Sequence, residues 1–266
     1  MPIPALGSLL KNVSQKELRL RLLIAIPVFN ERKTVAMVLD KVKHYCPDIL
    51  VVDDGSTDGT CEILAQRRDI QLIHHASNEG YGRSLIDAFN YAYSHGYDWA
   101  ITMDCDEQHE PESIPGFIGE INSDRWDVIS GSRYLRTGPG DDMPPVDRRA
   151  INVEMTDLVN TMFGLHITDA FCGFKAHRLR ETLKLRLDEG GYAFPIQFWP
   201  RVAKYGLRMT EIPVRLIYND PNRHFGGKLD DADYRLKHYL GVLQAEWDKI
   251  CDVSPDEPVP CCGRRR

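Results

Sequence analysis

The sequence predicts an α/β protein built on a mostly parallel sheet, and two observations lead to this class. Short runs rich in β-branched residues alternate with amphipathic helical segments through the first half of the chain. Acidic clusters directly follow two of those runs, at 53–58 and 104–106. Strands separated by helices of about a dozen residues are typical of right-handed βαβ units. Because ligands of open α/β sheets bind where parallel strands end, both clusters are expected at one edge of the sheet.

The first half is expected to contain five strands joined by four helices. The first helix shows the pattern most clearly, since Val35, Val38, Leu39 and Val42 form one apolar stripe. The expected strands are Leu22–Val28, Ile49–Val52, Ile70–His74, Trp99–Met103 and Val128–Ser130. The expected helices are Thr34–Tyr45, Thr60–Arg67, Tyr81–His95 and Glu112–Ile121.

The second half is less regular, and Gly- and Pro-rich segments interrupt it. We expect helices at Arg148–Phe163, Phe194–Tyr205 and Ala232–Lys249, a turn and short strand within Thr168–Ala176, and a strand at Arg208–Val214. Loops are expected at Thr137–Pro145 and Tyr218–Leu229. The predicted organisation is an N-terminal extension (1–20), one domain (21–250, with halves 21–135 and 136–250) and a disordered tail (251–266).

Composition excludes several classes of protein. The 266 residues include 33 basic and 39 acidic ones, a net charge of -6, and a duplex nucleic-acid binder usually carries a basic excess. The most apolar run, Leu22–Phe29, is too short to span a membrane. Seven cysteines without a CxxC pair make a disulfide framework or a zinc site unexpected. We therefore expect a cytoplasmic chain that meets a membrane, if at all, from the surface of its cytoplasmic face.

The cluster Asp104-Cys105-Asp106 points to a divalent cation. Two carboxylates two positions apart at a strand end can converge on Mg²⁺ or Mn²⁺, and Gln108 adds a neutral oxygen. A solvated acidic turn is the alternative. The adjacent pair Asp53-Asp54 is a second acidic site. Turn formation and helix capping account well for Gly55 and Asp58, but less well for two adjacent acids directly after an apolar run.

The order and spacing of several motifs resemble glycosyltransferase family 2, whose fold is named GT-A. The resemblance covers about residues 20 to 240, and its second half is similar to the dolichol-phosphate mannosyltransferase or polyprenyl-phosphate glycosyltransferase branch. The first-half motifs are Ile26-Pro-Val-Phe-Asn-Glu31, Val51-Val-Asp-Asp-Gly-Ser-Thr-Asp-Gly-Thr60, Asn78-Glu-Gly-Tyr-Gly82 and Met103-Asp-Cys-Asp-Glu-Gln-His-Glu-Pro111. The second-half motifs are Gly131-Ser-Arg-Tyr134, Arg148-Arg149 with Asn152, Asp169-Ala-Phe-Cys-Gly-Phe174, Glu211-Ile-Pro-Val214 and Arg223-His-Phe-Gly226.

The resemblance implies a metal-dependent inverting transfer of a sugar from GDP-mannose or a UDP-sugar to a polyprenyl phosphate. The residues that would bind the nucleotide sugar are Pro27, Phe29, Glu31, Asp54, Gly80, Asp104, Cys105 and Asp106. Those that would hold Mg²⁺ or Mn²⁺ are Asp104, Asp106 and Gln108. The residues expected to act at the diphosphate and the acceptor are Asp106, Arg133, Arg148, Asn152, Asp169 and Arg223. Nucleic acid is not an expected partner, while a membrane surface and a membrane-anchored partner subunit are compatible with the resemblance.

Independent chemistry supports part of this assignment. Arg148 and Asn152 are four positions apart and so share a helical face. Arginine binds phosphate through a planar, permanently charged fork, although surface ion pairs account for most arginines. Several positions depart from the family pattern, and most of them lie on the acceptor side. They are Tyr81 in place of a basic residue, Asn152, Cys172, Lys175 and His177.

Three alternatives stay open from the sequence. A family 2 enzyme acting on a soluble or glycan hydroxyl would need a general base, for which Asp169 is the candidate. A nucleotide-sugar-binding subunit without turnover is the second. The third concerns the helix at Arg148–Phe163, whose apolar stripe could lie in a membrane interface or in the ordinary core. That stripe comprises Ile151, Met155, Leu158, Val159 and Met162.

Overall fold

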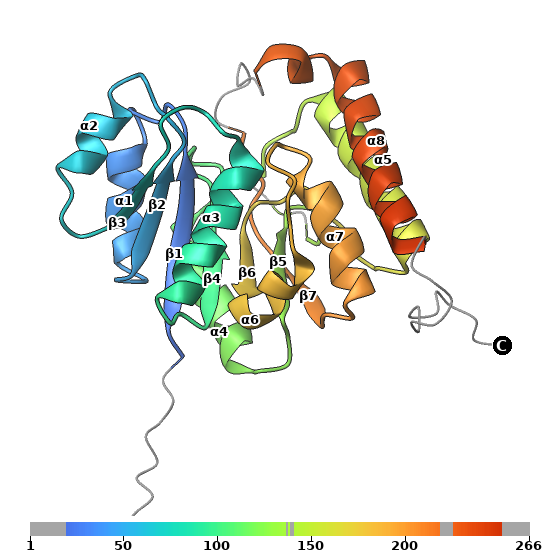
Figure 1. Cartoon of the computed structure of the whole chain (residues 1–266), viewed down its shortest axis with the longest axis horizontal. Coiled ribbons are helices and arrows are strands. Elements are labelled where there is room, and N and C mark those ends of the chain that lie inside the picture. The colour runs from blue at the N-terminus through green and yellow to red at the C-terminus, as the bar shows by residue number, and fades with distance from the viewer. Residues whose placement is uncertain (1–19, 137, 139–140, 219–225, 252–266) are drawn as a thin grey trace, which may run out of the picture.

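The computed structural model describes residues 20–136, 138, 141–218 and 226–251. Figure 1 shows a sheet with helices on both of its faces and a pair of long helices at one end. The expected N-terminal extension up to residue 19 and the tail from residue 252 lie outside the described residues, as does Arg223. Cys251, expected in the tail, instead ends the last helix.

Seven strands of the described residues form one sheet in the order β3-β2-β1-β4-β6-β5-β7. All neighbouring pairs are parallel except the two that involve β6, which runs antiparallel to β4 and to β5. The strands are β1 (Leu22–Val28), β2 (Ile49–Asp53), β3 (Gln71–His74), β4 (Trp99–Thr102), β5 (Val128–Ser132), β6 (Lys175–Arg178) and β7 (Met209–Pro213). The expected α/β class with a mostly parallel sheet is confirmed.

The helices match the expected ones closely in the first half and less well in the second. The main helices are α1 (Val35–Lys43), α2 (Thr60–Ala65), α3 (Tyr81–Ser94), α4 (Ile114–Asn122), α5 (Val146–Phe163), α6 (Leu179–Thr182), α7 (Phe194–Lys204) and α8 (Ala232–Cys251). Short 3-10 turns lie at η1 (Pro111–Ser113), η2 (Leu183–Leu185) and η3 (Gly227–Asp230). Neither α6 nor η2 was expected, because segments of three or four residues have no periodicity to detect. The strand expected within Thr168–Ala176 begins only at Lys175.

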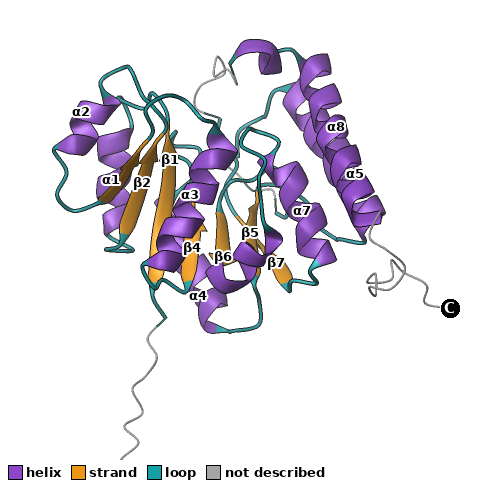
Figure 2. Ribbon diagram, viewed as in Figure 1, coloured by secondary structure: helices purple, strands orange, loops and turns teal. Residues whose placement is uncertain are grey.

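Each face of the sheet carries its own apolar core, as the layers in Figure 2 indicate. Alternation along β1 shows why, since Leu23 and Ala25 pack toward α3 whereas Ile24 and Ile26 pack toward α1 and α4. Strands of such a sheet are buried on both faces, so they appear in the sequence as continuous apolar runs.

The apolar stripe of α5 belongs to the core and not to an exposed interfacial surface. Ile151, Met155 and Val159 are buried, and Leu158 and Met162 pack against the same cluster. That cluster includes Trp199 of α7 and Leu243 of α8. The interfacial alternative for this stripe is therefore wrong, because neighbouring helices cover it. Among the described helices, none has the length and apolar character needed to cross a membrane.

A buried ion pair joins α7 to α8. The Arg201 guanidinium donates from Nε and Nη2 to the two carboxylate oxygens of Glu246, at 2.8 and 2.9 Å. Gln197 and Lys249 donate to the same carboxylate. Burial alone would raise the pKa of Glu246, but these hydrogen bonds lower it from 4.5 to about 2. This charged contact thus fixes α8, and removing one of its two partners should markedly lower the stability of the fold.

We predict that Arg201→Met lowers the free energy of unfolding by about 3–5 kcal/mol, because it leaves Glu246 buried without its cation. Chemical denaturation at pH 7 measures this. The matched control is Arg180→Met, since Arg180 pairs only with its neighbour Glu181 and its side chain is 73% exposed. That variant should change stability by less than about 0.5 kcal/mol.

The effect of Arg201→Met on the free energy of unfolding should depend on pH. A lowered native pKa stabilises the fold above the unfolded pKa near 4.5, and this contribution is lost as the pH falls toward about 2. Because burial without the Arg201 cation raises the Glu246 pKa of the variant above 4.5, the difference in stability between wild type and Arg201→Met should begin to narrow above pH 4.5 and continue to narrow toward pH 2. A difference that stays constant from pH 7 to pH 3, or equal effects of the two arginine substitutions, would contradict the assignment.

Candidate functional site

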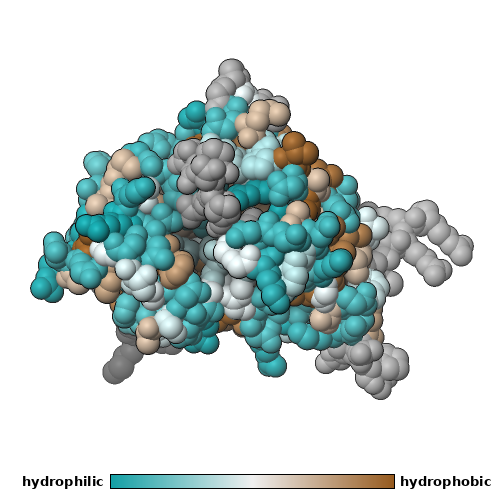
Figure 3. Space-filling model, turned by 90° about the horizontal axis from the view of Figure 1, so that it is seen from above, coloured by the Kyte–Doolittle hydropathy of each residue, from teal (hydrophilic) through white to brown (hydrophobic). Residues whose placement is uncertain are grey.

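A cavity of about 700 Å³ opens at the edge where the parallel strands end. Its walls come from the carboxyl ends of β1, β2, β4 and β5, the first turns of α3 and α5, and the side of α8. Figure 3 views the molecule from this edge, where hydrophilic residues prevail and apolar ones form small groups.

Most residues expected at the site do line this cavity. They are Pro27, Phe29, Glu31, Asp54, Gly80, Asp104, Cys105, Asp106, Gln108, Arg133, Arg148 and Asn152. Asp169 does not line it, and Arg223 lies outside the described residues. The contributions of Tyr81, Tyr192, Arg235 and Tyr239 were not expected from the sequence. Tyr81 lies within a recognised motif, whereas the other three belong to segments without any motif.

The acidic turn after β4 is fixed by a buried histidine. The backbone N–H of Asp104 donates to Nδ1 of His109 at 2.9 Å, and the His109 ring stacks on Phe174. Burial lowers the pKa of His109 to about 4, so the ring is neutral at pH 7 and can accept this bond. Glu107 takes a left-handed conformation (φ +63°), which lets the chain reverse between Asp106 and Gln108.

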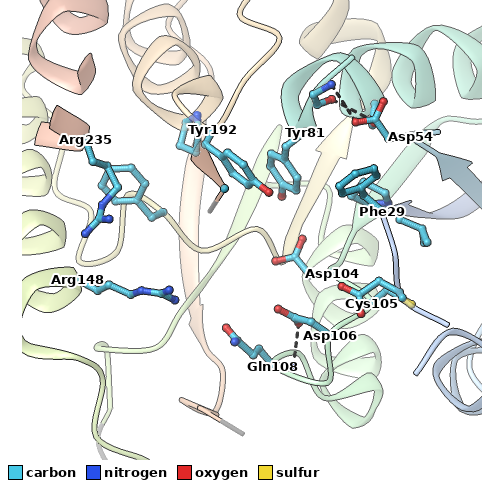
Figure 4. Close-up of a pocket in the computed structure, with 18 of the residues that line it drawn as sticks. Phe29, Asp54, Tyr81, Asp104, Cys105, Asp106, Gln108, Arg148, Tyr192 and Arg235 are labelled. Atoms are coloured by element: carbon cyan, nitrogen blue, oxygen red, sulfur yellow. Dashed lines mark hydrogen bonds between the residues drawn. The ribbon is translucent and has the colours of Figure 1, made fainter. Parts of the chain in front are cut away.

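The oxygens of this turn fit a hard divalent cation. Asp104 and Asp106 both face the cavity, and Asp106 also accepts the backbone N–H of Gln108 (Figure 4). The side-chain nitrogen of Gln108 is buried and has no hydrogen-bond acceptor among the described residues. A bound cation would explain this, because it would draw the amide oxygen toward Asp106 and turn the nitrogen away.

Tyr81 contacts the same acidic turn from α3. Its hydroxyl hydrogen-bonds to Asp104, and burial together with the Asp104 charge raises the pKa of the phenol well above its usual value. Gly173 leaves room for this contact, since a Cβ there would lie 2.6 Å from the Tyr81 hydroxyl and 2.9 Å from an Asp104 oxygen. Tyr81 is therefore placed to orient Asp104.

A second tyrosine joins the two halves of the domain at this point. The Tyr192 ring stacks on Tyr81 with centroids 5.9 Å apart and planes 9° from parallel (Figure 4). The loop that carries Tyr192 lies directly on the start of α3, where the backbone N–H of Arg83 donates to the Gly190 carbonyl. Gly80 allows this approach, because it has φ +109° and an added Cβ would lie 2.3 Å from that carbonyl oxygen.

The side of the cavity that the sequence assigns to the nucleoside combines an exposed aromatic ring, Phe29, with a hydrogen-bonded carboxylate, Asp54. Phe29 is 43% exposed and borders the cavity. Asp54 accepts the backbone N–H groups of Glu79 and Gly80 at 2.8 and 2.9 Å, and His75 bonds to it at 2.7 Å. Asp54 therefore shapes the loop before α3 in addition to lining the cavity.

Asp169 forms a buried ion pair with Arg133. Arg133 donates to both of its oxygens, at 2.7 and 2.9 Å, and Asn152 donates to one of them at 2.8 Å. Burial would raise the pKa of Asp169, but the Arg133 charge and these hydrogen bonds hold it well below the usual range. A general base needs a pKa near the working pH. The structure thus places Asp169 in an ion pair with Arg133, and its role as a general base for a hydroxyl acceptor stays a prediction from the sequence.

Two arginines lie across the cavity from the acidic turn. Arg148 comes from the first turn of α5 and Arg235 from α8, and Figure 4 shows the Arg148 guanidinium pointing toward the turn. Arg235 is buried and donates to Asp147 at 2.7 Å and to the Leu229 carbonyl at 2.7 Å. The cavity therefore has an acidic side suited to a cation and, opposite, the Arg148 guanidinium suited to a phosphate, with Arg235 held in the wall by Asp147.

Comparison with known proteins shows the family to which this chain belongs. Residues 23–185 match the family described as "Glycosyl transferase family 2". The undecaprenyl-phosphate mannosyltransferase of Micrococcus luteus is 28% identical over 244 residues, which are 87% of this chain and 98% of that protein. The polyprenol monophosphomannose synthase of Mycolicibacterium smegmatis is 30% identical over 239 residues, or 85% of this chain and 86% of that protein.

Among solved structures, glucosyl-3-phosphoglycerate synthase from Mycobacterium tuberculosis, in complex with Mn²⁺, UDP-glucose and phosphoglyceric acid, shares the fold. Its TM-score is 0.61 at 18% identity, with 86% of this chain and 80% of that chain covered. The expected GT-A architecture is confirmed. With its catalytic family and fold both established, the chain is a glycosyltransferase and belongs to glycosyl transferase family 2.

Proposed function

We propose that this enzyme moves a sugar from a nucleoside diphosphate sugar to a polyprenyl phosphate with inversion at the anomeric carbon. The observation that carries the proposal is the pairing of an acidic turn with two arginines across one cavity. A donor diphosphate with its cation suits Asp104 and Asp106, and a phosphate acceptor suits Arg148, while Arg235 adds positive charge to the same wall. The names of two relatives favour mannose and a polyprenyl acceptor, so GDP-mannose is the first donor to test.

The proposed reaction is one displacement. An oxygen of the acceptor phosphate forms a bond to the anomeric carbon while the bond from that carbon to the diphosphate breaks, and the electron pair leaves with the nucleoside diphosphate. An ionised phosphate needs no general base, which agrees with the commitment of Asp169 to Arg133. The task for the protein is to balance the charges of two phosphate groups and to align them.

Asp104, Asp106 and Gln108 would hold Mg²⁺ or Mn²⁺. The ion would supply positive charge to the departing diphosphate. The chain's own contribution is orientation, since His109 fixes the backbone of Asp104 and Tyr81 holds its carboxylate. Phe29 offers a ring face to the base, and Arg148 draws the acceptor phosphate to the opposite side.

The start of α5 suits a lipid acceptor. Met143 and Val146 are 88% and 86% exposed, and they precede Arg148 by five and two positions. Apolar side chains this exposed beside a phosphate-binding arginine can contact the first isoprene units of a polyprenyl chain. The acceptor lies in a bilayer, so we propose that the enzyme works at a membrane surface, on its cytoplasmic face.

The first test of the proposal uses labelled GDP-mannose, UDP-glucose and UDP-N-acetylglucosamine, each with and without a short polyprenyl phosphate. We expect label to enter the organic phase with one donor, only with Mg²⁺ or Mn²⁺ present. Chelation should abolish transfer, and Asp106→Asn should reduce kcat by at least about 100-fold, because charge on the leaving group loses its stabilisation. Release of nucleoside diphosphate without any lipid product would exclude the polyprenyl phosphate acceptor.

Arg148 separates acceptor binding from donor binding. We predict that Arg148→Ala raises KM for polyprenyl phosphate by roughly tenfold to 100-fold, the value of one charge-assisted hydrogen bond, with little change in KM for the donor. Arg180→Ala is the control, since this arginine is largely exposed and pairs only with Glu181. An equal rise in KM for the donor and for the acceptor would place Arg148 at the donor diphosphate instead.

Tyr81 should act through Asp104. We predict that Tyr81→Phe raises the Mn²⁺ concentration needed for half-maximal activity by about tenfold or more, because the hydroxyl that orients this carboxylate is lost. The ring and its stack on Tyr192 are kept in this variant. The control is Tyr192→Leu, which removes the stack and keeps the hydroxyl. If only Tyr192→Leu changes the metal requirement, Tyr81 does not position Asp104.

A further inference from the structure

We propose that Asp53, Cys61 and His74 form a second metal site, for a thiophilic divalent ion such as Zn²⁺, distinct from the oxygen site at Asp104 and Asp106. One ligand atom from each of the three side chains lies within 4.8 Å of the other two. None of the three side chains lines the large cavity, so this second site is separate from it in space.

Strand register and one helix bring these residues together. Asp53 ends β2 and His74 ends β3, and the two are direct partners in the parallel ladder. Cys61 is the second residue of α2, which follows the turn after β2. His74 Nδ1 lies 2.9 Å from Asp53 Oδ2 and 3.9 Å from Cys61 Sγ. Cys61 follows Asp53 by 8 positions and precedes His74 by 13, and the fold brings one donor atom of each to the same point.

The surroundings suit a metal ion that enters from solvent. Asp53 is fully buried, and its other oxygen accepts the Ser56 backbone N–H at 3.1 Å, so the carboxylate is held in place. Cys61 is half-buried and His74 is exposed on the outer side. Supported ligands of this kind retain their orientation before the metal arrives.

The chemistry of the three donors selects the kind of metal. A thiolate, an imidazole and a carboxylate are a typical set for Zn²⁺, with water in the fourth tetrahedral position. Mg²⁺ prefers oxygen ligands, and the Asp104 turn offers those instead. The two sites of this chain should therefore take different ions from a mixture.

Binding at this site requires the thiol to lose its proton to solvent. Without a metal, burial and the Asp53 charge raise the pKa of the Cys61 thiol, so the three groups rest as a hydrogen-bonded cluster. A cation replaces the thiol proton and relieves the repulsion between a thiolate and a carboxylate. Each Zn²⁺ bound near pH 7 should release close to one proton from Cys61.

The test is a Co²⁺ titration of the full chain in excess Mg²⁺, which occupies the oxygen site. We expect one equivalent of Co²⁺ to give intense tetrahedral d–d bands and a thiolate-to-metal charge-transfer band, both removed by Zn²⁺. Cys61→Ser should abolish the charge-transfer band. His74→Gln should weaken Zn²⁺ binding by at least about tenfold, as changes at metal sites commonly do.

Matched variants assign the bands to this site. Cys251→Ser alters an exposed thiol at the end of α8 and should leave the bands unchanged. Asp104→Asn should also leave them unchanged, because it alters only the oxygen site. Equal melting temperatures of wild type and Cys61→Ser without metal would show that the fold is kept. No charge-transfer band in wild type, or the same band in Cys61→Ser, would overturn the proposal.

Discussion

The parallel pairing of β2, β1 and β4 is the constraint on which the rest of the site depends. Because these strands run side by side in one direction, Asp54, Phe29 and Asp104 emerge at the same edge of the sheet. Each strand is buried on both faces, so its position is fixed by packing as well as by hydrogen bonds. The polar residues that follow the strands therefore start from defined positions, and contacts such as those of Asp54 with His75 and Gly80 then hold their side chains.

A second set of contacts attaches the second half of the domain (136–250) to this edge of the sheet. Arg133 at the end of β5 binds Asp169, and Asn152 of α5 binds the same carboxylate. The Tyr81–Tyr192 stack and the contact of Arg83 with Gly190 join the loop before α7 to α3. Residues that resemble phosphate ligands in the sequence thus divide into two roles. Arg133 and Arg148 both line the cavity, but Arg133 is paired with the buried Asp169 and so also stabilises the wall.

The first half of the domain (21–135) was predictable in most respects, because its strands, helices and motifs are local patterns in the sequence. The strands of residues 22–132 end within two residues of the expected positions, and every expected donor residue lines the cavity. The second half (136–250) was less predictable. Asp169 looked available as a base, because no local pattern reveals that Arg133, 36 positions away, neutralises it. The apolar stripe of α5 had two interpretations until α7 and α8 were seen to cover it.

The sequence alone determined the α/β class, the order of most elements, the family resemblance and the acidic turn, since each depends on neighbouring residues and their spacing. Tertiary structure decided which charged side chains line the cavity. It paired Asp169 with Arg133, brought Arg235 and Tyr192 to the cavity, and placed Cys61 beside His74 and Asp53. The physical reason is that burial and ion pairing depend on segments distant in the chain, which no local pattern encodes.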